Sequence, residues 1–150
     1  MFDPNVIIGK LTYIDSRLNR LRKFSEITLK EYQENLDCQD IVERNLKNLI
    51  QAAADTNRYL LKKQLDLSSG ELSEITNSDS FLRSAQAGIL PQSLAEKLSE
   101  SGKIWDVLAY LYDEVLPERV IEAVRNTLLY YPTYSNAIQS HVETMENEPC

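Results

Sequence analysis

Histidine is the side chain that most often transfers protons near neutral pH, and this sequence of 150 residues contains one, His141. Glu143 and Glu146 lie on nearby turns, but no cysteine or second histidine joins them to complete a metal-binding set. Cys38 and Cys150 have neither a metal-ligand spacing nor a disulfide framework, so we expect free thiols. We therefore predict no metal and no cofactor, and an ordinary surface or subunit-contact role for His141.

Common enzyme motifs are also missing: the sequence has no Gly-rich phosphate loop, no GxSxG elbow, no HExxH helix and no CxxC pair. Aromatic residues gather in the second half of the chain, at Trp105, Tyr110, Tyr112, Tyr130, Tyr131 and Tyr134. Stacking on nucleic acid bases would need lysine and arginine residues interleaved with these aromatic residues. Because such basic residues are scarce there, we expect the aromatic residues to pack in the core or at a subunit interface.

The overall charge also argues against broad binding to a phosphate backbone. Lysine and arginine number 16 against 23 acidic residues, which gives a formal net charge of −7. A small basic patch at Arg17, Arg20, Arg22 and Lys23 is interpreted as a solvated face. Nucleic acid is therefore not the default partner.

Length and composition predict a single domain over residues 1–150, because 43% hydrophobic content in a chain of this size is enough for a core. No run approaches the ~20 apolar residues that a membrane-spanning helix needs. The first ten residues lack the basic and then apolar layout of a secretory signal. We expect a cytoplasmic protein with no membrane association.

Apolar residues recur in steps of three and four, the spacing of one face of a helix. The first stripe predicts a helix over residues 4–36, with Asp3 as its N-cap and Pro4 in its first turn. A second stripe from Val42 to Leu60 predicts a long antiparallel helix. Residues 66–80, rich in Ser and acidic residues, are predicted to form a loop.

The second half of the chain continues the helical pattern. A short helix over 80–87 is expected to stop at Gly88, and the next segment is expected to be interrupted at Ser101–Gly102. The last stripe opens at Pro117 and contains Pro132, which predicts a kink near Tyr131. Together the segments predict an all-α, up-and-down helical bundle of about five helices.

The order of these segments resembles the HepT-like branch of the HEPN superfamily over nearly the whole chain. The resemblance lies in QDIVERNLKNLIQAAADTNRYLLKK and in SFLRSAQAGILPQSLAEKLSESGKIWDVLAYLYDEVLPERV. Within them, Glu43, Arg44, Leu46, Ala53 and Asp55, and then the run Phe81, Gly88, Ile89 and Leu90, carry the likeness. It implies a HEPN-like helical fold.

In that family a ribonuclease motif follows the small helix: arginine, asparagine, a few apolar positions, histidine, one variable residue and tyrosine. Placing the motif tyrosine on Tyr112 puts Trp105 at the arginine position, Asp106 at the asparagine position and Tyr110 at the histidine position. Three polar motif positions have thus changed. Loss of the arginine removes a cation for phosphate, loss of the imidazole removes a base suited to neutral pH, and Asp106 would repel RNA. A phenol, with a reference pKa near ~10, is a poor substitute base.

The resemblance implies a mode of association more strongly than it implies a reaction. HepT-like proteins form dimers with their motif helices face to face, so Trp105, Tyr110 and Lys103 become candidates for the dimer interface or cleft. Family members commonly act as toxins paired with an MNT-type nucleotidyltransferase antitoxin, which in some pairs transfers AMP to the motif tyrosine. Tyr112 is therefore a modification candidate, although a half-buried structural tyrosine is the more frequent case.

Three hypotheses remain open from the sequence. The leading one is a catalytically silent HepT-like homodimer that works by binding, with a nucleotidyltransferase or an active relative as partner. The second is a divergent, metal-independent ribonuclease that uses Asp106, Tyr110 and a basic residue such as Lys103, brought together from one subunit or from both. Lys103 is one turn or less from Asp106 on a helix, so the two charges could share a face. The third is a structural helical bundle without any nucleotide connection. Whether RNA is a ligand stays undecided.

Overall fold

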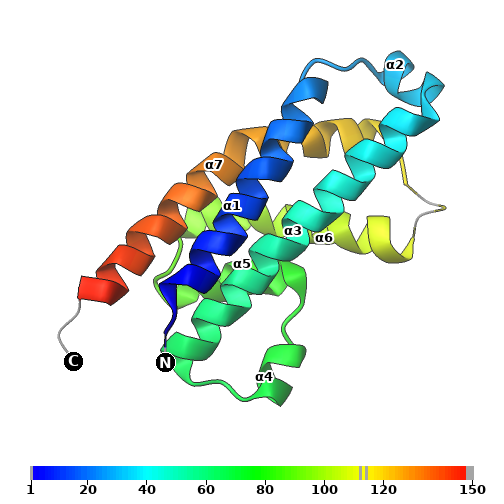
Figure 1. The fold of residues 1–150 in the computed structure, drawn as a ribbon. Helices are drawn as coiled ribbons and strands as arrows, with labels where there is room; N and C mark the ends of the chain where they lie inside the picture. The colour runs from blue at the N-terminus through cyan, green and yellow to red at the C-terminus, as the bar shows by residue number, and fades with distance from the viewer. Residues whose placement is uncertain (1, 112, 114, 148–150) are drawn as a thin grey trace.

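The computed structural model describes residues 2–111, 113 and 115–147. These residues form seven α-helices and one short 3₁₀ helix, with no strand among them, which confirms the all-α prediction (Figure 1). The helices are α1 (Pro4–Leu21), η1 (Arg22–Phe24), α2 (Leu29–Glu34), α3 (Leu36–Leu65), α4 (Ser69–Ser73), α5 (Asn77–Gln86), α6 (Gln92–Tyr110) and α7 (Pro117–Asn147).

The first predicted helix begins where expected but is shorter than expected. The Asp3 side chain accepts a hydrogen bond from the Asn5 N–H, so Asp3 is the N-cap of α1. The prediction of one helix to residue 36 is wrong, because the buried stripe ends at Leu21 and Thr28 starts a new helix. The Thr28 hydroxyl accepts from the Glu31 N–H, which stabilises α2 as a separate element.

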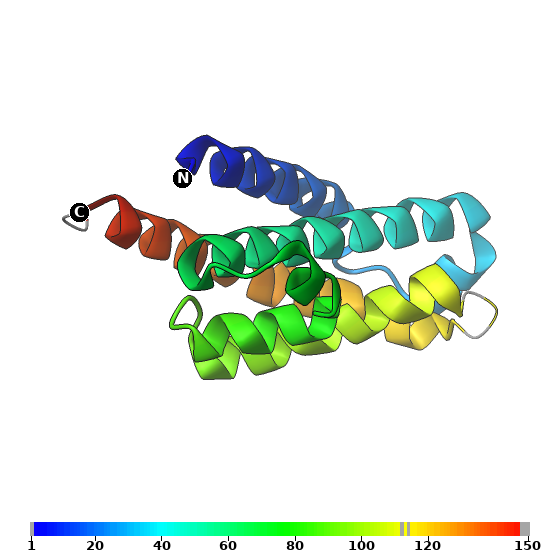
Figure 2. The ribbon, with the colours of Figure 1, turned by 90° about the horizontal axis from the view of Figure 1, so that it is seen from below.

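Helix α3 is the long second helix that the sequence predicts. Its stripe is buried at Val42, Leu46, Leu49, Ala53, Thr56 and Leu60, as expected. The Asn35 side chain caps its start by accepting from the Cys38 N–H, and Asp66, in the left-handed region at φ 53°, ends it. Helices α1 and α3 lie side by side and antiparallel, as both ribbon views show (Figures 1 and 2).

The segment 66–80 is not the loop predicted from its composition. It contains α4, whose Ser68 and Glu71 form a reciprocal capping box, and the first turn of α5, which is capped by the Thr76 hydroxyl. Helix α5 therefore starts at Asn77 rather than at residue 80. Its end agrees with the prediction, because Gly88 takes a left-handed backbone conformation at φ 78°.

Helices α6 and α7 are each continuous through the glycine or the proline in their sequence. Helix α6 continues through Ser101 and Gly102, so the predicted break there is wrong. Helix α7 continues through Pro132, and the predicted kink near Tyr131 stays a prediction. The two helices are antiparallel, and the start of α1 and the end of α7 lie at the same end of the bundle (Figures 1 and 2).

One continuous core joins these helices. Phe81 of α5 packs edge-on against Tyr131 and Tyr134 of α7, and all three side chains are fully buried. The prediction that the aromatic cluster serves packing is therefore confirmed for Tyr131 and Tyr134. None of the described helices is long and apolar enough to cross a membrane.

Candidate functional site

Trp105, Asp106 and Tyr110, which the resemblance puts at the polar motif positions, lie toward the end of α6, where three other segments of the chain form a groove with them. Leu94, Leu98 and Leu108 bury one face of α6 in the core. Trp105, Asp106 and Tyr110 lie on another face and line a groove of about 630 Å³. The sequence-predicted positions are thus brought together in one place by the helical repeat.

Trp105 and Tyr110 form the aromatic part of this groove. Their rings meet edge to face, with centroids 5.6 Å apart and planes at 79°. Trp105 packs partly against the core, and its indole N–H is buried with no hydrogen-bond partner in the described part of the chain. Tyr110 is 70% exposed, so much of its ring faces solvent beside Trp105.

Arg58 of α3 supplies a cation to the same groove, which the analysis of the sequence did not identify. Its guanidinium donates to the Ile75 carbonyl oxygen at 2.8 Å and to the Asn77 amide oxygen at 2.7 Å. It also lies 3.5 Å from the carboxylate of Asp55. The guanidinium therefore joins α3 to the segment between α4 and α5.

Gln51 closes this set of contacts into a ring. Its amide nitrogen donates to Asp55 at 2.8 Å, and its amide oxygen accepts from Asn77 at 3.2 Å. Gln51, Asp55 and Arg58 are spaced four and three residues apart on α3, a spacing that places them on one helical face. The spacing of these three residues is visible in the sequence. The position of Asn77 next to them depends on the tertiary fold.

Lys103 does not join Trp105, Asp106 and Tyr110 within one chain. It lines a different cavity, between α6 and α7, and forms an ion pair with Glu100 at 3.1 Å. Among the described residues it makes no ion pair with Asp106. The hypothesis of a ribonuclease site built from Lys103, Asp106 and Tyr110 would therefore need contributions from two chains.

The remaining candidates lie elsewhere or outside the described residues. Tyr112, the modification candidate, and Cys150 are outside them. Cys38 is a buried free thiol. The His141 ring nitrogen Nε2 lies 2.8 Å from the Gln64 amide oxygen on α3, away from the groove residues. The described part of the chain holds no group of three His, Cys, Asp or Glu side chains that could bind a metal.

The groove presents two aromatic rings, the Asp106 carboxylate and the Arg58 guanidinium. Among the described residues that line it there is no imidazole, and the guanidinium already bonds to a carbonyl, an amide and a carboxylate. The exposed Asp106 carboxylate lines the groove and would repel the negative charge of a phosphate. Such a surface suits recognition of a partner.

Comparison with known proteins places the whole chain in one family. A family model described as Ribonuclease HepT-like matches residues 14–143. The chain is 34% identical over 146 residues to the tRNA nuclease HepT of Aphanizomenon flos-aquae (strain 2012/KM1/D3), covering 97% of this chain and 96% of that protein.

Solved structures agree on the fold. The tri-AMPylated Shewanella oneidensis HEPN toxin in complex with MNT antitoxin has a TM-score of 0.77 at 21% identity, covering 93% of this chain and 99% of that one. A toxin–antitoxin structure with AMP-PNP has a TM-score of 0.76 at 20% identity, covering 91% and 98%. At these identities the likeness concerns the fold, and the family follows from the sequence matches. The chain belongs to the Ribonuclease HepT-like family.

Proposed function

We propose that this protein is a HepT-like family member without ribonuclease activity, which acts as a dimeric binding partner in a HEPN/MNT-type toxin–antitoxin system. The proposal is supported by the groove that Trp105, Asp106 and Tyr110 line, because the resemblance puts these aromatic and acidic side chains at the family's arginine, asparagine and histidine positions. The same proposal includes a cytoplasmic location and a single domain over residues 1–150.

The charges in the groove favour binding over RNA cleavage. A backbone phosphate needs a cation that can turn toward it. The Arg58 guanidinium is held by the Ile75 carbonyl and by Asn77, and the Asp55 carboxylate already offsets its charge. The exposed Asp106 carboxylate adds repulsion toward RNA, on a chain whose formal net charge is −7.

The exposed aromatic ring supports an interface at the same place. Tyr110 is 70% exposed, and Leu111 and Leu116 beside the end of α6 are 47% and 49% exposed. Tyrosine and tryptophan are enriched at the centres of protein interfaces. We assign this end of α6 to the homodimer contact, with Trp105 and Tyr110 filling what is a cleft in active relatives.

The partner class comes from the fold relatives. One of them is a HEPN toxin in complex with an MNT antitoxin, so a nucleotidyltransferase of that type is the proposed partner. Tyr112 stays the proposed modification site, by its position in the motif.

The test is cleavage of a mixed pool of structured RNA and transfer RNA. The native protein is compared with the triple variant Trp105→Arg, Asp106→Asn, Tyr110→His, which restores the family pattern. We expect the native protein to be inert and the triple variant to cut. Leu129→Arg, which adds a cation at a 63% exposed position on α7, is the matched control and should stay inert.

An active but divergent ribonuclease is the second candidate, because the chain is 34% identical to a tRNA nuclease over nearly its whole length. Cleavage by the native protein that is lost in Asp106→Asn or Tyr110→Phe would establish this candidate and overturn the first. Light scattering on the purified protein tests the dimer separately, and a monomer at micromolar concentration would contradict the proposed contact.

A further inference from the structure

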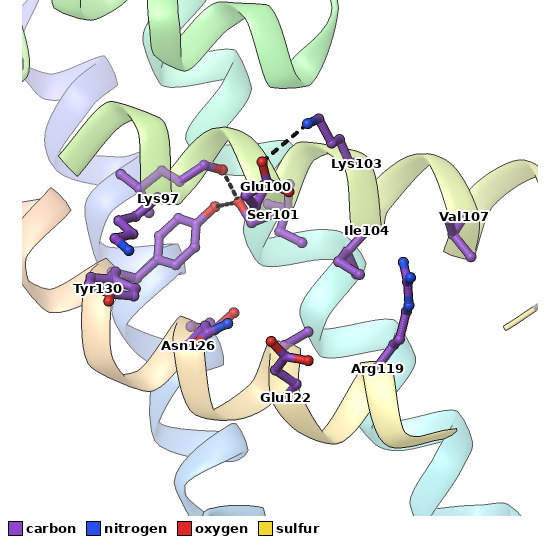
Figure 3. A pocket seen from close by; sticks show the side chains of 15 residues that line it. Lys97, Glu100, Ser101, Lys103, Ile104, Val107, Arg119, Glu122, Asn126 and Tyr130 are labelled. Carbon is purple, nitrogen blue, oxygen red and sulfur yellow. Dashed lines mark hydrogen bonds and ion pairs between the residues drawn. The ribbon is translucent and has the colours of Figure 1, made fainter. Parts of the chain in front are cut away.

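A second cavity lies between α6 and α7 and shares no lining residue with the groove of Trp105, Asp106 and Tyr110 (Figure 3). Its volume is about 380 Å³, within the range of small-molecule sites in proteins. Lys97, Ser101 and Ile104 follow each other at steps of four and three along α6, so they turn toward α7 together. The cavity is therefore a separate feature of the fold.

The floor of this cavity is apolar, and two of the hydroxyl groups that line it are already bonded. Ile50 and Leu98 lie at the floor, and both are buried. The hydroxyl groups of Ser101 and Tyr131 lie 2.7 Å apart, and Ser101 also donates to the Leu98 carbonyl oxygen. A ligand here meets an apolar surface below, and the charged groups available to it lie at the rim.

The rim carries an excess of positive charge, although the whole chain is acidic. Its cations are Lys97, Lys103 and Arg119, and its carboxylates are Glu100 and Glu122. Glu100 pairs with Lys103 at 3.1 Å. That pair leaves two cations and one carboxylate around the opening.

Lys97 and Arg119 are the cations free to hold a ligand. Within the described part of the chain, neither forms an ion pair with any carboxylate. Figure 3 shows Lys97 beside Tyr130 at one side of the cavity and Arg119 extending toward Val107 at the other. The two cations therefore lie at opposite ends of the opening, with the cavity between them.

The side walls suit a flat, largely apolar body. Ile104 and Val107 are half-buried on α6, and Tyr130 is half-buried on α7, at the end of the cavity where Lys97 lies (Figure 3). Aromatic and aliphatic walls with a few polar groups at the rim are the usual composition of small-molecule sites. An anionic group without such a body would leave these walls in contact with water.

We propose that the cavity between α6 and α7 binds a small organic anion, in which a flat apolar body lies against Ile104 and Tyr130 and Lys97 and Arg119 hold the negative group. Glu122, also at the rim, opposes the ligand's charge and limits its affinity. The site does not depend on RNA cleavage or on an antitoxin.

The probe for this site is 1-anilinonaphthalene-8-sulfonate, an aromatic anion whose fluorescence rises on binding. We expect saturable binding of one molecule per chain of the native, folded protein. Lys97→Gln and Arg119→Gln should each weaken binding by about five- to tenfold, the loss of one charge-assisted contact. Glu122→Gln should tighten it by about threefold, since removal of the opposing charge favours the anion.

Two controls separate this site from nonspecific binding. Arg125→Gln removes an exposed cation of α7 that does not line the cavity, and it should leave binding unchanged. N-phenyl-1-naphthylamine has the same aromatic body without the sulfonate. It should bind at least about tenfold more weakly and respond to neither Lys97→Gln nor Arg119→Gln.

Ala123→Leu provides a test that does not involve charge, because Ala123 is 8% exposed in the cavity lining and a larger side chain there reduces the volume. It should abolish binding of the sulfonate, with near-ultraviolet circular dichroism confirming a native fold. Binding that stays unchanged in Lys97→Gln, Arg119→Gln and Ala123→Leu would overturn the proposal. So would equal affinity for the uncharged analogue, or no binding by the native protein at millimolar probe.

Discussion

The hydroxyl group of Tyr134, on α7, donates a hydrogen bond of 2.7 Å to the amide oxygen of Asn57, on α3. The Asn57 amide nitrogen in turn donates to the Ser80 hydroxyl on α5 at 3.0 Å. All three side chains are fully buried, and burial raises the pKa of Tyr134 well above the ordinary phenol value. This chain of polar contacts joins three helices through the middle of the apolar core.

Tyr134→Phe removes one link of that chain and keeps the ring. The Asn57 amide oxygen then lies buried without its donor, so we expect the free energy of unfolding to fall by about 1–3 kcal/mol. Urea denaturation measures the change. Tyr13→Phe is the matched control, since the Tyr13 side chain is 37% exposed, and it should change stability by less than about 0.5 kcal/mol.

Gly102 lies where α6 meets the start of α5. A Cβ atom at this position would lie 2.5 Å from the Ser78 backbone nitrogen and 2.6 Å from its Cα, which forces the helices apart. We expect Gly102→Ala to destabilise the fold by about 1–3 kcal/mol, in spite of the better helix propensity of alanine.

Gly9→Ala is the control for this prediction. Gly9 lies in α1 with nothing within 4 Å of its added Cβ, so the same substitution should stabilise the protein by about 0.5–1 kcal/mol. Chemical denaturation of both variants gives the comparison. Equal effects at the two positions would show that the close approach of α5 and α6 does not require glycine.

Gly102 also illustrates which features of the fold can be predicted from the sequence. Apolar spacing is local, so the stripes of α1 and α3 could be predicted from single segments. The sequence suggested a break at Gly102 because glycine weakens an isolated helix. Its actual role, room for the Ser78 backbone, depends on packing between helices. The helix α4 was missed because its Ser68–Glu71 capping box stands in a segment with few apolar residues.

The same contrast between local and long-range features holds for the candidate site. Trp105, Asp106 and Tyr110 could be placed together because they follow one another on a single helix. Arg58 could not, since its partners Ile75 and Asn77 come from a segment 17 and 19 residues away in the sequence. Pairing over such distances is decided by tertiary packing, for which one sequence carries no local signal.

Arg58→Met tests the structural part of Arg58's role. Methionine keeps much of the length but no donor, so the Ile75 carbonyl oxygen loses its contacts and the free energy of unfolding should fall by about 1–3 kcal/mol. The segment around α4 should exchange its amide hydrogens faster, because the guanidinium is its link to α3. Hydrogen exchange by mass spectrometry measures this local effect.

Arg125→Met is the control for Arg58→Met, because Arg125 is exposed on α7 and lines none of the groove. It should leave both stability and exchange near α4 unchanged. Unaltered exchange there in Arg58→Met would show that α4 is held mainly by its apolar contacts.

Glu43 predicts an effect of pH on stability. Burial, and to a smaller extent the neighbouring Asp40 carboxylate, raise the pKa of Glu43 above its usual value of 4.5. The folded state therefore binds this proton more tightly than the unfolded state does. The contribution of Glu43 to the free energy of unfolding must then fall as the pH rises from the usual glutamate pKa through the raised pKa of the folded state.

Glu43→Gln removes this titration and retains a polar side chain of similar size. We expect the variant to be more stable than the native protein at pH 7, and the difference to shrink toward pH 4, where the native Glu43 becomes protonated in both states. Urea denaturation across this range measures it, with Glu26→Gln as the control because Glu26 is exposed. Lys47 attracts the ionised carboxylate and offsets part of the gain. A stability difference that grows toward low pH would contradict the assignment, because it would require a lowered pKa in the folded state.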